Sequence, residues 1–203
     1  MLKLSGKKGL PMGLRQRQKE NRRKEILDCS LNLFIRRGYE GTSTREISRA
    51  LGISSGLLFH YYDTKERLYL EHLKTALDGI RMMEEYLLLP LSPIQIFHEI
   101  AEAALSYFAI SPATAKVFLL ARQALTADYL TEEMKETVRE MNIADRFVPT
   151  VRAGQKAGEI RAGDPRSLAL CFFSAMESAA ENAVCFPSVP MPEADWLVDL
   201  IKA

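Results

Sequence analysis

The chain has 203 residues, of which 47% are hydrophobic, and this is enough for one large domain or two smaller ones. No apolar run approaches the roughly 20 residues of a membrane span, and no hydrophobic leader follows the charged N-terminus, so no membrane association is expected. Three cysteines without metal-like spacing favour free thiols and a cytoplasmic location. Three histidines without a paired motif give no reason to expect a metal or any other cofactor.

The net charge of +1 is unevenly divided along the chain. Residues 1–67 carry 15 lysines and arginines against 7 aspartates and glutamates, which gives +8, whereas residues 68–203 carry 12 against 19, which gives −7. A basic head on an acidic body predicts that only the head meets a polyanion such as double-stranded DNA. The alternative is a solvated arm with a chance excess of basic residues.

Helical periodicity dominates the chain, and no strand-like alternation stands out, so we predict an all-α fold. Capping residues before prolines at 92–93, 111–112 and 164–165 mark helix starts. About nine helices are expected: 17–37, 43–51, 55–61, 65–88, 93–109, 112–126, 131–157, 165–184 and 193–202. The predicted divisions are a disordered arm over 1–14, with Met12 as an alternative start, a head over 15–67 and a body over 68–203.

The first helix begins with the run RQRQKENRRKE, and its apolar residues Leu27, Leu31 and Phe34 lie on a separate face. The cationic end consists of Arg15, Arg17, Lys19, Arg22 and Arg23. Such a run is often only a solvated helix surface. Here phosphate contact is the better hypothesis because a binding motif follows.

That motif is STREISRALGISSGLLFHYY. Ser43 and Glu46 have the spacing of a capping box, and Gly52 permits a tight turn. Because residues three and four apart share a helix face, Leu58, Tyr61 and Tyr62 lie together. The pattern is typical of a helix-turn-helix, the kind of unit that places its second helix in the DNA major groove.

On the opposite side of this second helix we expect Gly56 and His60, flanked by Leu57 and Phe59. Gly56 has no side chain to hold the helix away from a partner, so another backbone can approach closely. A recognition helix enters the major groove by its N-terminal end, which here is Ser55-Gly56-Leu57.

The segment of roughly residues 22–68 resembles the TetR/AcrR family of transcriptional regulators. The matching residues are Ile26-Leu27, Leu33-Phe34, Gly38-Tyr39, Thr42-Ser43, Ile47, Leu51-Gly52-Ile53, Gly56, Leu58-Phe59-His60-Tyr61-Tyr62 and Lys65-Glu66. The resemblance implies an all-helical homodimer with a three-helix DNA-binding head and a variable body that binds an effector and forms the dimer.

Carried over residue by residue, the resemblance assigns the head as follows. The expected phosphate contacts are Thr42 or Thr44, His60, Tyr61 and Lys65, beside the basic Arg22, and the expected base contacts are Arg45, Ser55, Gly56 and Leu57. Phe59 stands where the family often has tyrosine, and it has no hydroxyl to donate to a phosphate. The short Ser55 and the apolar Leu57 favour readout of thymine methyls and DNA shape.

In the body, the segment 165–184 is apolar nearly all round, which implies that it is covered on two sides. We predict a dimer interface formed by Leu168, Phe172, Ala175, Met176, Ala179, Ala183, Trp196 and Leu200. The alternative is that the last helix alone covers this segment and no dimer forms.

Arg122, Asp145 and Glu177 interrupt apolar stripes, and an unpaired buried charge is costly. They either form ion pairs in the core or line a cavity, and the sequence leaves both open. The predicted cavity wall consists of Met82, Met83, Tyr86, Phe97, Ile100, Tyr107, Phe118, Met141 and Phe173. Its methionines would adapt to a small hydrophobic effector. Pro149 would kink the helix beside the cavity. The helix from Lys65 to Leu88 would act as the lever that connects the cavity to the DNA-binding head.

The resulting hypothesis is a repressor that an effector releases from a palindromic operator. One alternative is a DNA-binding protein without a small-molecule effector, controlled by a protein partner or associated with the nucleoid. A remote alternative is a helical enzyme. We predict no enzymatic activity, because the sequence has no nucleophile elbow, phosphate-binding loop, dinucleotide fingerprint or metal cluster.

Overall fold

The computed structural model describes residues 13–203, and over that range it confirms the predicted all-α class. Its elements are α1 (Leu14–Arg37), α2 (Thr44–Leu51), α3 (Ser55–Tyr61), α4 (Lys65–Glu85), the 3-10 turn η1 (Tyr86–Leu88), α5 (Pro93–Ile110), α6 (Pro112–Ala124), α7 (Glu132–Glu140), α8 (Ile143–Ala157), α9 (Pro165–Cys185) and α10 (Ala194–Val198). The predicted arm, with Met12, lies outside the described residues except for its last two. Of these, Leu14 already belongs to α1.

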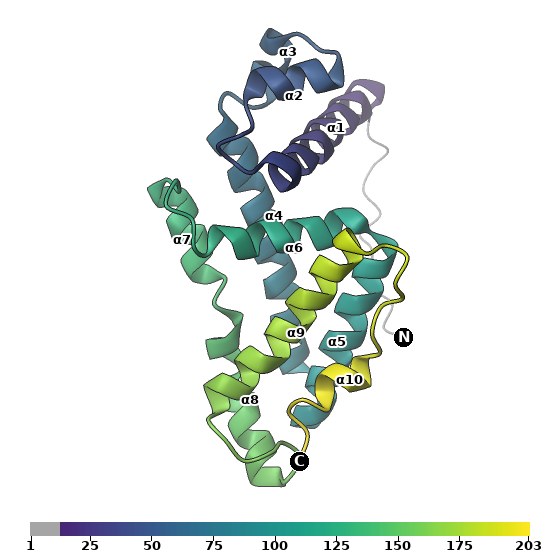
Figure 1. Cartoon of the computed structure of the whole chain (residues 1–203), viewed down its shortest axis with the longest axis vertical. Helices are drawn as coiled ribbons and strands as arrows, with labels where there is room; N and C mark the ends of the chain where they lie inside the picture. Colours follow the sequence, from purple (N-terminus) through teal and green to yellow (C-terminus); the bar gives the residue numbers. More distant parts are fainter. Residues whose placement is uncertain (1–12) are drawn as a thin grey trace.

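Figure 1 shows the three helices α1–α3 at one end of an elongated molecule. Helix α4 leads from them into the body, and α6 crosses it. Helices α5, α8, α9 and α10 form the other end (Figure 1). Within residues 13–203, no single helix is both long and apolar enough to cross a membrane, and α5 and α6 meet that criterion only as a pair bent by 113°.

The predicted helix over 131–157 was wrong as a single element, because it divides into α7 and α8 at Met141 and Asn142. Arg146 stabilises the break by donating to the carbonyl oxygen of Glu140 at 2.7 Å and by pairing with Glu84 of α4. A basic group near the last carbonyls of a helix is favourable. Helix α8 continues past Pro149 and ends at Gly158, which has a left-handed conformation (φ 74°).

The buried side chains form two clusters. One joins α1–α3 to α4, α6 and α7, and includes Ile26, Leu58, Leu73 and Leu120. The other packs α5, α8, α9 and α10 together and centres on four phenylalanines, Phe97, Phe147, Phe172 and Phe173. The head therefore shares its core with three helices of the body.

An aromatic cluster joins the head to the loop between α6 and α7. The Tyr129 ring of that loop stacks on Tyr39 of the head, with ring centroids 4.3 Å apart and planes at 7°. The hydroxyls of Tyr129 and Tyr69 lie 2.9 Å apart, and Tyr39 donates to Glu66 at 2.8 Å. Burial raises the pKa of both Tyr39 and Tyr69, so these hydroxyls stay protonated and able to donate.

Candidate nucleic-acid interface and pocket

Local hydrogen bonds fix the geometry of the helix-turn-helix. The backbone N–H of Glu46 donates to Ser43 Oγ at 3.2 Å, and the N–H of Ser43 donates to the Glu46 carboxylate at 2.9 Å, which completes the predicted capping box. The Ser43 hydroxyl also donates to the Glu46 carboxylate, at 3.0 Å, and this bond, together with that from the Ser43 N–H, lowers the pKa of Glu46, so the carboxylate remains ionised at neutral pH. Gly52 ends α2 in a left-handed conformation (φ 65°), and Ser54 caps α3 by accepting from the N–H of Leu57.

The turn directs one edge of α3 outward. Leu58 is fully buried and Tyr62 nearly so, which anchors the opposite edge in the core. Gly56 and His60 are exposed, and Leu57 and Phe59 remain 38% and 48% exposed. A Cβ added at Gly56 would meet nothing within 4 Å. The glycine is therefore not required by packing inside the subunit.

Among the other predicted DNA contacts, Arg45 and Ser55 are exposed and Thr44 is partly exposed. Tyr61 is partly exposed, and its ring meets that of His60 edge-on at 5.5 Å. Thr44 also borders an open hollow, whose other lining residues are Glu40, Thr42, Ser43, Phe59, Asp63, Thr64 and Lys65. A phosphate oxygen placed there would meet hydroxyl and ammonium donors, but also the carboxylates of Glu40 and Asp63, so the approach has to be from the Thr44 and Lys65 side.

Thr42 is not available as the sequence predicted. Its side chain is 2% exposed, and its hydroxyl donates to the carbonyl oxygen of Gly38 at 2.9 Å. Thr42 therefore closes the turn after α1, and Thr44 is the better placed of the two threonines. The compact turn that begins at Gly38 buries the Thr42 side chain, and the spacing of the residues in the sequence alone did not reveal this.

The basic side chains of the head differ in how strongly contacts within the subunit hold them. Arg22 forms an exposed pair with Glu25 at 2.7 Å. Arg23 donates to the Tyr62 hydroxyl at 2.8 Å and pairs with Glu71, so it holds α1 against α3 and α4. The Lys65 ammonium donates to the carbonyl oxygen of Tyr39 at 3.0 Å and lies 3.9 Å from the centre of that ring. An ammonium has three donors, so Lys65 can hold this contact and still meet a phosphate.

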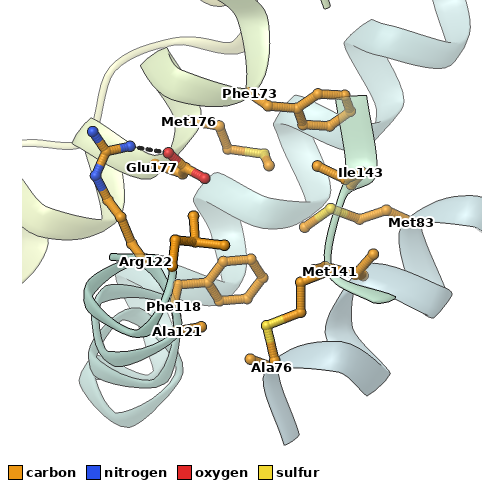
Figure 2. Close-up of a pocket in the computed structure, with 12 residues that line it drawn as sticks. Ala76, Met83, Phe118, Ala121, Arg122, Met141, Ile143, Phe173, Met176 and Glu177 are labelled. Atoms are coloured by element: carbon orange, nitrogen blue, oxygen red, sulfur yellow. Dashed lines mark hydrogen bonds and ion pairs between the residues drawn. The ribbon is translucent and has the colours of Figure 1, made fainter. Parts of the chain in front are cut away.

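The body contains a small pocket between α4, α6, α9 and the α7–α8 break (Figure 2). Its cavity volume is about 40 Å³. The lining residues are Ala76, Ile80, Met83, Phe118, Ala121, Arg122, Leu125, Met141, Ile143, Phe173, Met176 and Glu177. Effector sites are usually about 300–1,000 Å³, so this pocket is too small to hold an effector in the present conformation.

Half of the predicted effector-binding residues meet at this pocket: Met83, Phe118, Arg122, Met141, Phe173 and Glu177. The other six do not line it. Met82 and Tyr107 are about half exposed, Phe97 and Ile100 are buried in the body core, Tyr86 packs at the edge of that core, and Asp145 is exposed. Within residues 13–203, the predicted wall residues therefore do not enclose one common cavity in this conformation.

The predicted charges pair, but not in the interior. Arg122 and Glu177 form an ion pair at the pocket, with side chains 49% and 27% exposed. Asp145 pairs with Arg166 on the surface, and this contact, with that of Asn142, lowers the pKa of the carboxyl. Arg122 and Glu177 thus line the pocket, as in the second alternative, and their ion pair is partly exposed and not a core pair as in the first.

The predicted dimer residues also divide. Phe172, Met176 and Ala179 are at most 3% exposed, because α9 packs on α8 and α6 of its own subunit, so these three have no surface left for a partner. Met176 lines the pocket instead. Leu168, Ala175 and Ala183 are partly buried, whereas Trp196 and Leu200 are 60% and 45% exposed. Other residues of α9, which were not assigned to an interface from the sequence, are exposed: Leu170, Cys171, Ser174, Ser178 and Cys185.

The model of the family described as "Bacterial regulatory proteins, tetR family" matches residues 26–72, which contain the helix-turn-helix. Residues 26–72 form the DNA-binding domain of the TetR family of transcriptional regulators. This TetR-family match covers the residues that form the exposed edge of α3 and the start of α4.

Similar proteins match either a short segment or most of the chain. The repressor KstR2 of Rhodococcus jostii is 44% identical over 62 residues, so the alignment spans only 30% of either chain. The regulator RutR of Escherichia coli K12 is 25% identical over 178 residues, which cover 84% of this chain and 79% of RutR. The crystal structure of the MbdR regulator from Azoarcus shares the fold with a TM-score of 0.72 at 20% identity, covering 87% of this chain and 95% of that one.

Proposed function

We propose that this protein is a repressor that binds a palindromic operator as a homodimer and leaves it when a small hydrophobic molecule enters the pocket at Arg122 and Glu177. It acts by binding and needs no catalytic step. The observation that carries the DNA-binding part is the exposed edge of α3, where Gly56 offers bare backbone between Ser55 and Leu57. Release requires that the effector prefer the conformer with misplaced recognition helices.

For the dimer, we propose an interface on the exposed side of α9 and on α10 with the turn that follows. Leu170, Trp196 and Leu200 are all more than 40% exposed there, although each is large and hydrophobic. Two copies joined by a two-fold axis would place the recognition helices about one DNA turn, ~34–36 Å, apart.

A single experiment tests the DNA-binding part. Operator DNA would be selected from a random pool and titrated against the wild type and Gly56→Leu in a fluorescence anisotropy assay at several salt concentrations. We expect steep salt dependence for the wild type, because Lys and Arg contacts release counterions. We expect Gly56→Leu to lose at least about 100-fold in operator affinity while keeping weak, salt-dependent binding to random DNA.

Gly56→Leu is a clean probe because the new side chain points into open space and meets nothing within the subunit at its Cβ. Arg152→Ala, an exposed change on α8, provides the matched control and should bind normally. Wild-type operator affinity in Gly56→Leu would show that α3 does not face the groove in this orientation.

A second candidate is a repressor without a small-molecule effector, controlled by a protein partner. The small volume of the pocket and the Arg122–Glu177 ion pair at its wall favour it, since little space and no unpaired charge is left for a ligand in this conformation. We nevertheless favour the effector hypothesis, because Met83, Met141 and Met176 surround the pocket and flexible methionines can rearrange. A panel of lipophilic compounds tested for operator release distinguishes the two.

A further inference from the structure

The pocket wall is chemically one-sided. Among its twelve lining residues, Arg122 is the only one whose side chain can donate a hydrogen bond, and Glu177 is the only one whose side chain carries oxygen. The rest are aliphatic side chains, three methionines and two phenylalanines. An anionic ligand would need donors, and the wall has a single donor side chain, whose positive charge is already paired with Glu177 through Nη1.

The two charged groups are not equally placed toward the cavity. In Figure 2 the guanidinium of Arg122 reaches Glu177 from the side away from Met83, Ile143 and Phe173. The Glu177 carboxylate lies between that guanidinium and the apolar side chains (Figure 2). A molecule that occupies the pocket therefore meets the carboxylate first.

The two groups also differ in how easily they can leave the pair. Arg122 is 49% exposed on a long side chain, so its guanidinium can turn into water and become fully hydrated. The shorter Glu177 side chain is 27% exposed and stays on the pocket side of α9. Half-exposed ion pairs contribute little, so displacing Arg122 is inexpensive, provided that Glu177 gains another cation.

The aromatic side chains of the pocket also favour a positively charged ligand. Phe118 and Phe173 both line the pocket, and the face of an aromatic ring attracts a cation, most strongly when both are shielded from water. The ring of Phe118 also packs edge-on against Phe108 at 5.3 Å, which fixes its orientation. The wall thus combines one carboxylate, two rings and polarisable sulfur atoms.

We propose that the effector is a lipophilic cation, an organic amine or quaternary ammonium with an apolar body, whose positive group replaces the Arg122 guanidinium at Glu177. This inference rests on the proposed function, because it takes the pocket to be the effector site. The apolar body occupies the space that opens when Arg122 and the methionines move aside.

The test uses three probes with the same ten-carbon chain: decyltrimethylammonium and decanoate, each below its micelle-forming concentration, and decanol below its solubility limit. Binding to the 203-residue chain is measured by isothermal titration calorimetry. Arg122→Gln and Glu177→Gln are compared with Glu136→Gln, an exposed carboxylate on α7 outside the pocket. Thermal unfolding of each variant verifies that it folds.

We expect decyltrimethylammonium to bind the wild type more tightly than decanoate does. Glu177→Gln should weaken the cation about tenfold or more, because the charge partner is lost. Arg122→Gln should strengthen it about two- to fivefold, because the competing guanidinium is removed. Glu136→Gln should remain within about twofold of the wild type.

Two results would overturn the inference while leaving the pocket as an effector site: decanoate binding best and losing affinity in Arg122→Gln, or decyltrimethylammonium binding Glu177→Gln as tightly as the wild type. Failure of all three probes to bind, in a protein that still binds its operator, would remove both the cation inference and the effector part of the proposed function. Loss of operator binding by the wild type would instead concern the head alone.

Discussion

His72 is the one deeply buried histidine of the three in the chain, at 3% exposure. Its Nε2 lies 2.9 Å from Ser30 Oγ of α1, and its ring meets that of Phe34 edge-on. Burial lowers its pKa from 6.5 to about 4, because the charged imidazolium would lose its hydration. The folded protein therefore keeps His72 neutral at a pH where the unfolded chain protonates it.

The sign of the effect follows from proton uptake. Between pH 6.5 and 4 the unfolded state binds the additional proton, so the free energy of unfolding decreases as the pH falls through this window. We predict that His72 accounts for a loss of about 2 kcal/mol between pH 7.5 and 5, from the depressed pKa. Urea unfolding of the wild type, His72→Gln and the exposed-site control His60→Gln measures it. An equal pH dependence in all three would contradict the prediction.

At the scale of elements, the head was predictable because its signals are local. The Ser43 capping box, the Gly52 turn and the buried Leu58 each depend on residues within one or two turns of one another. The α7–α8 break was not predictable in this way. It depends on Arg146, which reaches back to Glu140 and across to Glu84 of α4, 62 positions earlier in the chain.

The pocket was only half predictable for a similar reason. Met82 and Met83 are adjacent in sequence and similar in chemistry, yet they point about 100° apart on α4. Only Met83 faces α6 and α9. Met176 was assigned to the dimer because α9 is apolar on several sides, and only the packing of α6 and α8 decides which side is internal.

The loop between α6 and α7 should contribute to stability through Tyr129. We predict that Tyr129→Ala lowers the free energy of unfolding by about 2 kcal/mol, because it removes the ring stack on Tyr39 and the contact with the Tyr69 hydroxyl. Tyr129→Phe keeps the stack and should cost only about 1 kcal/mol. Urea unfolding compares the two, and equal losses would show that the ring stack does not stabilise the fold.

At the scale of the whole molecule, assembly should depend on exposed side chains rather than on the core of α9. We predict that Trp196→Glu combined with Leu200→Glu yields a monomer in sedimentation velocity, because charge is introduced into an apolar contact. Its thermal unfolding should stay cooperative, since both side chains are largely exposed in the subunit.

Phe172→Glu is the matched comparison for this prediction. Phe172 is fully buried among Phe97 and Phe173, so a carboxylate there should disrupt folding itself and not assembly alone. A dimer that survives the double change at Trp196 and Leu200 would place the two-fold contact on another surface.

The shared core of the head has a consequence for building chimeras. The helix-turn-helix side chains pack in one cluster with Leu73 of α4, Leu120 of α6 and Met134 of α7. A recombinant that exchanged only residues 15–67 with another regulator would therefore join two half-cores that were not selected to fit. Exchanges that also carry the inner faces of α4, α6 and α7, together with the Tyr129 loop, should retain cooperative folding and combine a new operator preference with the old pocket.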